Sequence, residues 1–309
     1  MGAKIDMASH ITISEKTSLN GFLKFYGWQD IDDEFINQIA ENSIIKFVQI
    51  ASSLPRQAFD IIDRILSVRQ DMYLRIYGLY GEETIDLSLL QNMKNLKHLV
   101  LDFSVKNRQD KFDFSVLTKL ENLQSLRLNL FDLKDYSFVN NLSHNLEELY
   151  ISTDTMGGGI VFDCRWLLQY RQLKNLYLGK KAKKNIESIA QLEKLGNLTL
   201  RGIKLKSFDF LKDRNLKSLA VHWCSMNDLP SLAGFTSLKN LELWCIAKLE
   251  DISFVSTLEN LENLNLTDLK YIHTLPDLSA LKNLKDIKID NVPVDISTLP
   301  EDIQKIIHR

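Results

Sequence analysis

Glycine, proline and cysteine, which are abundant in several protein classes, are scarce in this chain. Of its 309 residues, 12 are glycines, 5 are prolines and 3 are cysteines. So little glycine and proline excludes a collagen-like or linker-rich architecture. The cysteines, Cys164, Cys224 and Cys245, are too few and too scattered for a disulfide framework or a zinc site. We therefore expect a reduced, cytoplasmic protein, in which a Cys224–Cys245 disulfide is an alternative not favoured over two free thiols.

A long apolar segment and an excess of charge of one sign are also missing. No run approaches the roughly 18 apolar residues needed to cross a bilayer, and residues 1–18 lack the apolar core of a signal peptide. Lysine and arginine number 38 and aspartate and glutamate 40, which gives a net charge of -2. We expect neither a membrane nor a nucleic acid as partner, while export by a dedicated system stays open.

The dominant pattern in the sequence is a repeat of the form Leu-x-x-Leu-x-Leu. It occurs nine times between residues 96 and 289, at spacings of 21 to 27 residues. The copies begin at Leu96, Leu123, Leu146, Leu173, Leu195, Leu216, Leu238, Leu261 and Leu284. A fainter copy at Ile45/Val48/Ile50, and partial ones at Leu74/Ile76 and Leu23/Phe25, extend the pattern to twelve repeats that average 24 residues.

This pattern resembles the leucine-rich repeat family over residues 20–294, and its shorter copies resemble the repeats of bacterial internalins. The resemblance implies an α/β fold, a curved solenoid with a parallel sheet on its concave side and helices and 3₁₀ turns on its convex side. The residues agree, because alternating apolar side chains form a strand with one buried face, which one unit cannot bury alone. We expect one parallel sheet with strands at 97–101, 124–128, 147–151, 174–178, 196–200, 217–221, 239–243, 262–266 and 285–289, preceded by about three more.

The expected domain organisation has three parts. Residues 1–19 form an N-terminal cap, residues 20–294 carry about 12 repeats, and residues 295–309 form a C-terminal capping helix, because an open solenoid exposes its core. Residues 55–67 begin with Pro55 and place Phe59, Ile62 and Leu66 on one helical face. This predicts an α-helix on the convex side.

The repeats depart from the family consensus in one respect. The consensus places Asn or Cys three residues after the last strand leucine, and only Cys224 conforms. Asparagine instead recurs just before the first leucine, at Asn95, Asn122, Asn145, Asn215, Asn260 and Asn283. We therefore expect irregular loops after the strands.

No pattern typical of catalysis, cofactor binding or metal binding is present, so we expect neither an enzyme nor a cofactor. The run 157–159 (Gly-Gly-Gly) lacks the context of a phosphate-binding loop and predicts a loop insertion. The six histidines lie on different repeats without metal-ligand spacing. The lysines of residues 180–184 form either a solvated loop or a contact for an acidic partner, phosphate or nucleic acid.

The concave face offers the best candidates for binding. Strand side chains alternate, so the variable positions between and after the motif leucines point away from the core. Tyrosine, tryptophan and arginine recur there, and these residues are enriched at interface hot spots. The alternative is that aromatic side chains simply suit strands and cover one another. We predict a partner-binding set of Tyr73, Arg75, Tyr77, Arg127, Tyr150, Tyr177, Arg201, His222, Trp223, Glu242 and Trp244.

These observations indicate a monomeric, non-catalytic protein that binds another protein through its concave face. A cytoplasmic bacterial immunity or inhibitor protein that binds a toxin is one role of this kind. The alternative is a secreted or host-directed effector similar to internalins. A third hypothesis, the substrate-recognition part of a ligase-type enzyme, would need a catalytic domain beyond the repeats.

Overall fold

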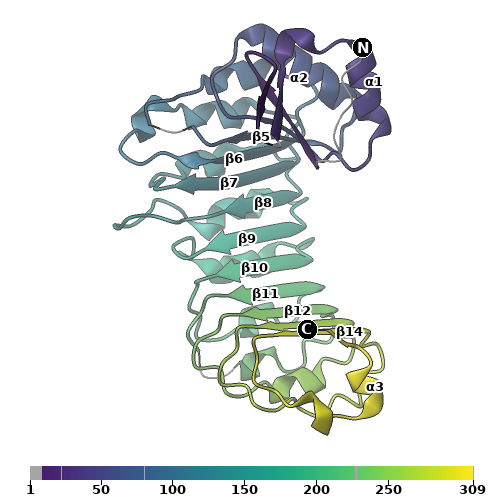
Figure 1. Cartoon of the computed structure of the whole chain (residues 1–309). Helices are drawn as coiled ribbons and strands as arrows, with labels where there is room; N and C mark the ends of the chain where they lie inside the picture. The colour runs from purple at the N-terminus through teal and green to yellow at the C-terminus, as the bar shows by residue number, and fades with distance from the viewer. Residues whose placement is uncertain (1–8, 22, 80, 227–228, 309) are drawn as a thin grey trace. The chain divides into compact units, whose positions relative to one another are not determined.

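The structure, a computed structural model, describes residues 9–21, 23–79, 81–226 and 229–308. Residues 1–8 of the expected N-terminal cap lie outside the described residues. The chain divides into two compact units, residues 1–162 (the N-terminal unit) and residues 163–309 (the C-terminal unit). Each unit is built on a sheet of mainly parallel strands, with helices and turns packed against one of its faces (Figure 1). In each unit the opposite face, which we call the outward face, carries the side chains that point away from the core.

In the N-terminal unit the sheet order is β8-β7-β6-β5-β4-β1-β3-β2, and every described pair of neighbours is parallel except β2 and β3. The strands are β1 (His10–Ser14), β2 (Ser18–Asn20), β3 (Leu23–Gly27), β4 (Phe47–Ile50), β5 (Tyr73–Tyr77), β6 (His98–Ser104), β7 (Ser125–Phe131) and β8 (Glu148–Ile151). The helices are η1 (Trp28–Asp30), α1 (Asp33–Glu41), α2 (Arg56–Val68), η2 (Leu87–Asn92), η3 (Gln109–Lys111), η4 (Phe114–Lys119) and η5 (Ser137–Asn141). Helix α2 follows Pro55 and buries Phe59, Ile62 and Leu66, as the sequence predicts.

In the C-terminal unit the strands run in chain order across the sheet, and all their pairings are parallel. They are β9 (Asn175–Gly179), β10 (Asn197–Arg201), β11 (Ser218–His222), β12 (Asn240–Trp244), β13 (Asn263–Thr267), β14 (Asp286–Asp290) and β15 (Ile307–His308). Their connections contain η6 (Cys164–Gln169), η7 (Ile186–Gln191), η8 (Asp209–Leu211), η9 (Pro230–Leu232), η10 (Ser253–Thr257), η11 (Ile296–Thr298) and α3 (Glu301–Gln304). Helix α3 is short, and β15 after it pairs with β14 at the sheet edge.

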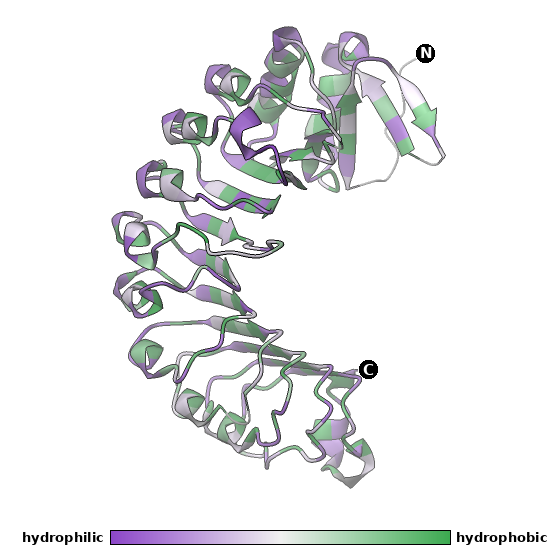
Figure 2. Cartoon of the chain, turned by 90° about the vertical axis from the view of Figure 1, so that its left-hand side faces the viewer, coloured by the Kyte–Doolittle hydropathy of each residue, from purple (hydrophilic) through white to green (hydrophobic). Residues whose placement is uncertain are grey.

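The leucine motif sets the sheet register, which confirms the expected fold. Strands β6 to β14 each begin one residue later than the sequence predicts. Equivalent motif positions pair directly, as Leu198 does with Leu219 and Leu219 with Leu241. Within these nine copies only Leu284 is half-buried, and all the other motif side chains are buried. The alternation of apolar and polar residues along the strands is visible in Figure 2.

The first strand of the repeat was predicted in the wrong place. We expected Leu23 and Phe25 to fill the core beside Val48 and Ile50, but β1 lies between β3 and β4 and supplies Ile11 and Ile13 at these positions. Strand β3 pairs with β1 in a register that buries Tyr26 and leaves Leu23 exposed. A shift of one residue exchanges the two faces of a strand, which explains the error.

The recurring asparagines join neighbouring repeats at the turn before each strand. The side-chain amides of Asn122, Asn145 and Asn260 donate to the carbonyl oxygens of Lys94, Glu121 and Thr236 at 2.7–3.0 Å. Each acceptor lies one repeat earlier in the chain. These asparagines precede the strand, whereas the consensus asparagine follows it. They satisfy backbone carbonyl groups that would otherwise lack partners.

A second recurring hydrogen bond, from a backbone amide to an aspartate side chain, lies at the start of the turns behind the sheet. Aspartate carboxylates accept hydrogen bonds from the backbone amide two residues later, as at Asp86, Asp113 and Asp163. The same bond recurs at Asp135, Asp251, Asp277 and Asp295. A carboxylate at this position stabilises the first turn of a helix. The sequence signal is Asp-x-Ser, with Arg165 in place of serine after Asp163.

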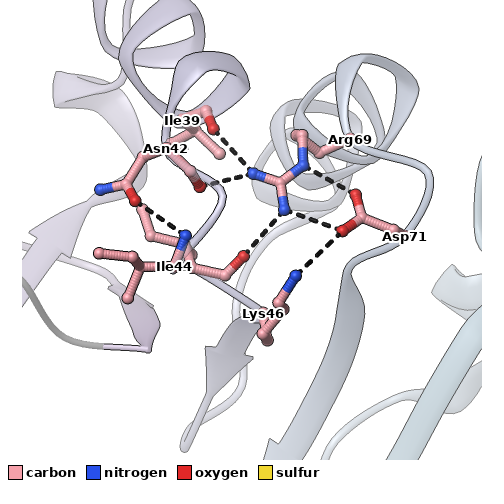
Figure 3. A network of polar contacts seen from close by, with 7 residues as sticks. Ile39, Asn42, Ile44, Lys46, Arg69 and Asp71 are labelled. Atoms are coloured by element: carbon pink, nitrogen blue, oxygen red, sulfur yellow. Dashed lines mark hydrogen bonds and ion pairs between the residues drawn. The ribbon is translucent and has the colours of Figure 1, made fainter.

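Arg69 fixes the way α1 and α2 meet the sheet (Figure 3). Its guanidinium donates to the carbonyl oxygens of Ile39, Asn42 and Ile45 at 2.6–3.2 Å, and it pairs with Asp71 through two further bonds. The Arg69 side chain is only 11% exposed. One charged group therefore satisfies the backbone at the end of α1 and at the entry to β4.

Within the described part of the chain, no helix is long and apolar enough to cross a membrane.

Candidate functional site

The predicted site residues on the N-terminal unit pack mainly against one another. Arg127 on β7 lies over the ring of Tyr73 on β5, with its guanidinium carbon 4.7 Å from the ring centroid, and forms an ion pair with Glu148. Tyr73 also contacts Phe47 and His98, at ring-centroid distances of 5.4 and 4.9 Å. These side chains cover each other along neighbouring strands. This agrees with the alternative explanation, in which aromatic residues suit strands and cover one another. Burial lowers the pKa of His98, which favours its neutral form.

Arg75 belongs to a second lateral network on the same unit. It forms an ion pair with Asp102, donates to Gln49 at 3.3 Å, and lies 4.9 Å from the ring centroid of Tyr77. Asp102 also accepts from Asn129 at 2.6 Å. The network therefore connects four strands of the outward face, from β4 to β7. Arg75 and Tyr77 are half-buried, and the Arg75 guanidinium has its partners within the sheet.

The remaining tyrosines of the predicted set lie in different units. Tyr150 on β8 is half-buried and pairs with Arg127 in the register of the N-terminal unit. Tyr177 on β9 is half-buried and pairs with Thr199 in the C-terminal unit. The structure thus places Tyr150 beside Arg127 in the N-terminal unit and Tyr177 beside Thr199 in the C-terminal unit.

The C-terminal unit brings five of the predicted residues together, and we call them the tryptophan cluster: Arg201, His222, Trp223, Glu242 and Trp244. Trp244 on β12 lies edge to face with His222 and with Trp223, at centroid distances of 5.3 and 5.6 Å. The Arg201 guanidinium carbon lies 5.9 Å from the ring centroid of Trp223. The cluster spans three adjacent strands at their carboxyl ends.

Trp223 stands out within this cluster because of its backbone. It is 49% exposed and has a φ of 55°, in the left-handed region that large side chains rarely adopt. Equivalent positions after β10, β12, β13 and β14 hold Gly202, Cys245, Asp268 and Asn291, all with positive φ. Each of Gly202, Trp223, Cys245 and Asp268 donates its N–H to a carbonyl of the next repeat at 2.7–2.9 Å. Glycine, asparagine or aspartate suits this turn, whereas tryptophan there costs conformational energy.

Polar contacts fix the orientation of the other members of the cluster. The Trp244 Nε1–H donates to Asp268 at 2.9 Å, and Nε2 of His222 lies 3.2 Å from a carboxylate oxygen of Glu242. Contact with His222 lowers the pKa of Glu242, so this carboxyl group stays ionised at neutral pH. The cluster thus combines an exposed indole with a cation and a carboxylate at defined positions.

The other chemical candidates from the sequence have structural explanations. Cys164 and Cys224 are buried, and burial raises their thiol pKa values to about 12 and about 11; Cys245 is half-buried, and all three are free. The loop containing Gly157–Gly159 is anchored by Lys134, which donates to the Gly157 carbonyl at 2.7 Å. In the part of the chain that the structure describes, no group of three or more His, Cys, Asp or Glu residues could hold a metal ion.

Comparison with known proteins identifies the fold but no close relative. No family model and no curated protein matches the sequence. A leucine-rich-repeat protein of Leptospira interrogans is similar in structure, with a TM-score of 0.53 and 19% identity over 90% of this chain and 73% of that protein. The internalin InlF of Listeria monocytogenes has a TM-score of 0.46 and 20% identity, over 84% and 77% of the two chains. The internalin InlC2 of the same organism has a TM-score of 0.40 and 24% identity, over 57% and 74%.

The Leptospira structure shares the fold, and three features of the repeats identify the same fold. Motif leucines fill the core strand by strand, short 3₁₀ turns lie behind the strands, and neighbouring repeats pair in parallel register. This chain has the leucine-rich-repeat fold.

Proposed function

We propose that this protein binds another protein through the outward face of its C-terminal unit, with the tryptophan cluster at the centre of the contact. The observation that carries the proposal is Trp223, a half-exposed tryptophan in a left-handed backbone conformation. Strained residues that the surrounding fold maintains occur preferentially at functional sites. A rigid aromatic side chain beside an arginine is also typical of interface hot spots.

The proposal separates the eleven predicted residues into two groups. On the N-terminal unit, Arg75 and Arg127 are held by ion pairs and ring contacts within the sheet, which supports a stabilising role. On the C-terminal unit, Trp223 leaves half of its surface exposed, and Arg201 lies beside it. We assign the principal contact to the second group, with Tyr177 at its margin.

The test is recovery of the partner by affinity purification, followed by measurement of its affinity for variants. We expect Arg201→Ala and Trp244→Ala to weaken binding by about thirtyfold or more, which corresponds to about 2 kcal/mol at a hot spot. Tyr271→Ala is the matched control, because Tyr271 is a half-exposed aromatic residue of the same unit outside the cluster. Affinities equal to that of the wild type for both cluster variants would contradict the proposal.

For the biological role, we propose a cytoplasmic inhibitor or immunity protein that covers the functional surface of a toxin. Support comes from the rigid side chains of the cluster, which suit one-to-one binding with slow dissociation. The test is co-expression with the product of a neighbouring gene: a toxin whose activity the wild type blocks, and the Trp244→Ala variant does not, supports this role. Export of the protein into culture medium would favour the effector hypothesis instead.

A further inference from the structure

The loops that follow β9 and β10 carry an unusual concentration of positive charge. Residues 180–185 and 201–208 contain seven lysines and arginines and no aspartate or glutamate. Of these, Lys184 pairs with Asp163 at 3.4 Å. We call the other six the basic edge: Lys180, Lys181, Lys183, Arg201, Lys204 and Lys206. Among them Lys180, Lys183, Lys204 and Lys206 are exposed.

The fold brings these two loops into direct contact. Gly179 at the end of β9 pairs with Arg201 at the end of β10. A Cβ atom on Gly202 would lie 2.6 Å from Cγ of Lys180, so the lysine side chain crosses the turn at a residue that has no side chain. Gly202 has a φ of 67° as well, which a glycine adopts without strain. The glycine therefore serves both the turn and the close approach of Lys180.

The basic edge is continuous with the tryptophan cluster, because Arg201 belongs to both. On the far side of the cluster the excess of positive charge ends, and carboxylates accompany the lysines. Asp268 directly follows β13, and Asp290 is the last residue of β14. The backbone amide of Asp268 donates to the backbone carbonyl of Asp290 at 2.9 Å. Lys270 lies near Asp268, and Lys288 lies on β14 two residues before Asp290. The carboxyl ends of the strands therefore present an excess of cations, then two tryptophans, then carboxylates with lysines beside them.

We propose that the basic edge binds an acidic segment of the partner protein, in an extended chain whose apolar residue contacts Trp223 and whose other end is basic. This inference rests on the proposed function and adds the chemistry of the partner. A nucleic acid carries negative charge along its whole length, so its phosphates would meet Asp268 and Asp290 on the far side of the cluster. A protein segment can place opposite charges at its two ends, and such complementarity determines orientation and partner choice.

The dimensions define a suitable probe. Six strands from β9 to β14 at about 4.8 Å spacing extend over about 24 Å, which an extended peptide of nine residues covers. The probe is a fluorescein-labelled peptide of four glutamates, one leucine and four lysines in that order. The control peptide has the same composition with the charges alternating. A nine-nucleotide oligothymidylate with the same label tests the competing class of ligand.

Fluorescence anisotropy at low ionic strength then tests the inference with the whole protein. We expect the segregated peptide to bind at least about fivefold more tightly than the alternating peptide, and salt to weaken its binding. The triple variant Lys183→Glu, Lys204→Glu and Lys206→Glu should weaken it by about tenfold or more. The matched control, Lys212→Glu, Lys282→Glu and Lys305→Glu, makes the same change in net charge at exposed lysines of the same unit, outside the basic edge and the tryptophan cluster. It should not weaken binding.

The outcomes separate this inference from the proposed function. Equal binding of the two peptides, or no effect of the basic-edge variant, overturns the inference. Tighter binding of the oligonucleotide through the same lysines also overturns it, in favour of a nucleic-acid site. Loss of peptide binding in the basic-edge variant, with wild-type binding in Trp244→Ala, supports the basic edge and contradicts the central role of the tryptophan cluster.

Discussion

Trp223 and Trp244 lie edge to face, with ring centroids 5.6 Å apart and ring planes inclined by 68°. The two residues are held differently. Trp244 is fixed by its strand and by the hydrogen bond from Nε1 to Asp268, whereas Trp223 follows the strand in a left-handed turn and is half exposed. Trp244 therefore positions Trp223, and Trp223 offers the surface that a partner can cover.

Replacement of Trp223 should separate binding from folding. Asparagine adopts the left-handed conformation with little strain, and this gain offsets the lost ring contacts of the tryptophan. We expect the free energy of unfolding of Trp223→Asn to stay within about 1 kcal/mol of the wild type. Affinity for the partner should fall about tenfold or more. Chemical denaturation and a binding titration measure the two effects, and a loss of stability as large as the loss of affinity would make Trp223 a structural residue.

Truncation of motif leucines tests the core. Leu198 and Leu241 are 1% exposed and pair with motif leucines of the next strand. We expect Leu198→Ala or Leu241→Ala to lower the free energy of unfolding by roughly 2–5 kcal/mol, because each leaves a cavity in a packed core. Repeats stabilise their neighbours, so hydrogen exchange should show the damage first in the adjacent strands.

Thr199→Ala is the control for these variants. Thr199 lies next to Leu198 on the same strand and points to the outward face. The change should alter the free energy of unfolding by no more than about 0.5 kcal/mol. Equal effects of Leu198→Ala and Thr199→Ala would show that the register of β10 is wrong.

The sequence predicted the fold where the periodic signal is strong. A leucine motif repeated nine times determines which face of each strand is buried, and β6 to β14 follow it. The signal fails at β1, where the strand contributes Ile11 and Ile13 without leucine, and the segment around Leu23 offers a competing pattern. Local periodicity cannot decide between two short strands when the choice depends on long-range pairing.

The site was predictable only as a set of outward positions. Alternation identifies which side chains leave the core, but it does not indicate that Arg127 covers Tyr73 while Trp223 stays half exposed. Those differences depend on contacts between strands more than 20 residues apart in the chain. A tryptophan at a turn position that holds glycine, cysteine, aspartate or asparagine after β10, β12, β13 and β14 is a signal that an alignment of the repeats could have found.

Arg69 should be essential to the N-terminal unit. Arg69→Met keeps most of the side-chain volume but removes the donors to the carbonyls of Ile39, Asn42 and Ile45. We expect a loss of about 2–4 kcal/mol in the free energy of unfolding, because buried carbonyl groups lose charged partners. Arg64→Met is the control on α2, the helix that Arg69 directly follows, since Arg64 pairs with Asp33 at the exposed surface. It should cost no more than about 1 kcal/mol, and equal effects of the two changes would contradict the role of Arg69.

The Arg69–Asp71 pair should also give the N-terminal unit a distinct response to acid. The hydrogen bonds from Arg69 lower the pKa of Asp71 from 3.8 to about 2. A carboxyl group with a lowered pKa in the folded state stabilises the fold fully above its unfolded pKa, and this contribution disappears as the pH falls through the folded value. The pair should therefore stabilise the protein above about pH 4 and lose its effect between pH 4 and pH 2. The measurement is the free energy of unfolding of the wild type and of Asp71→Asn across this range. The wild type should be more stable at pH 6, and the difference should shrink toward pH 2. A difference that is constant with pH would show that Asp71 acts without its charge.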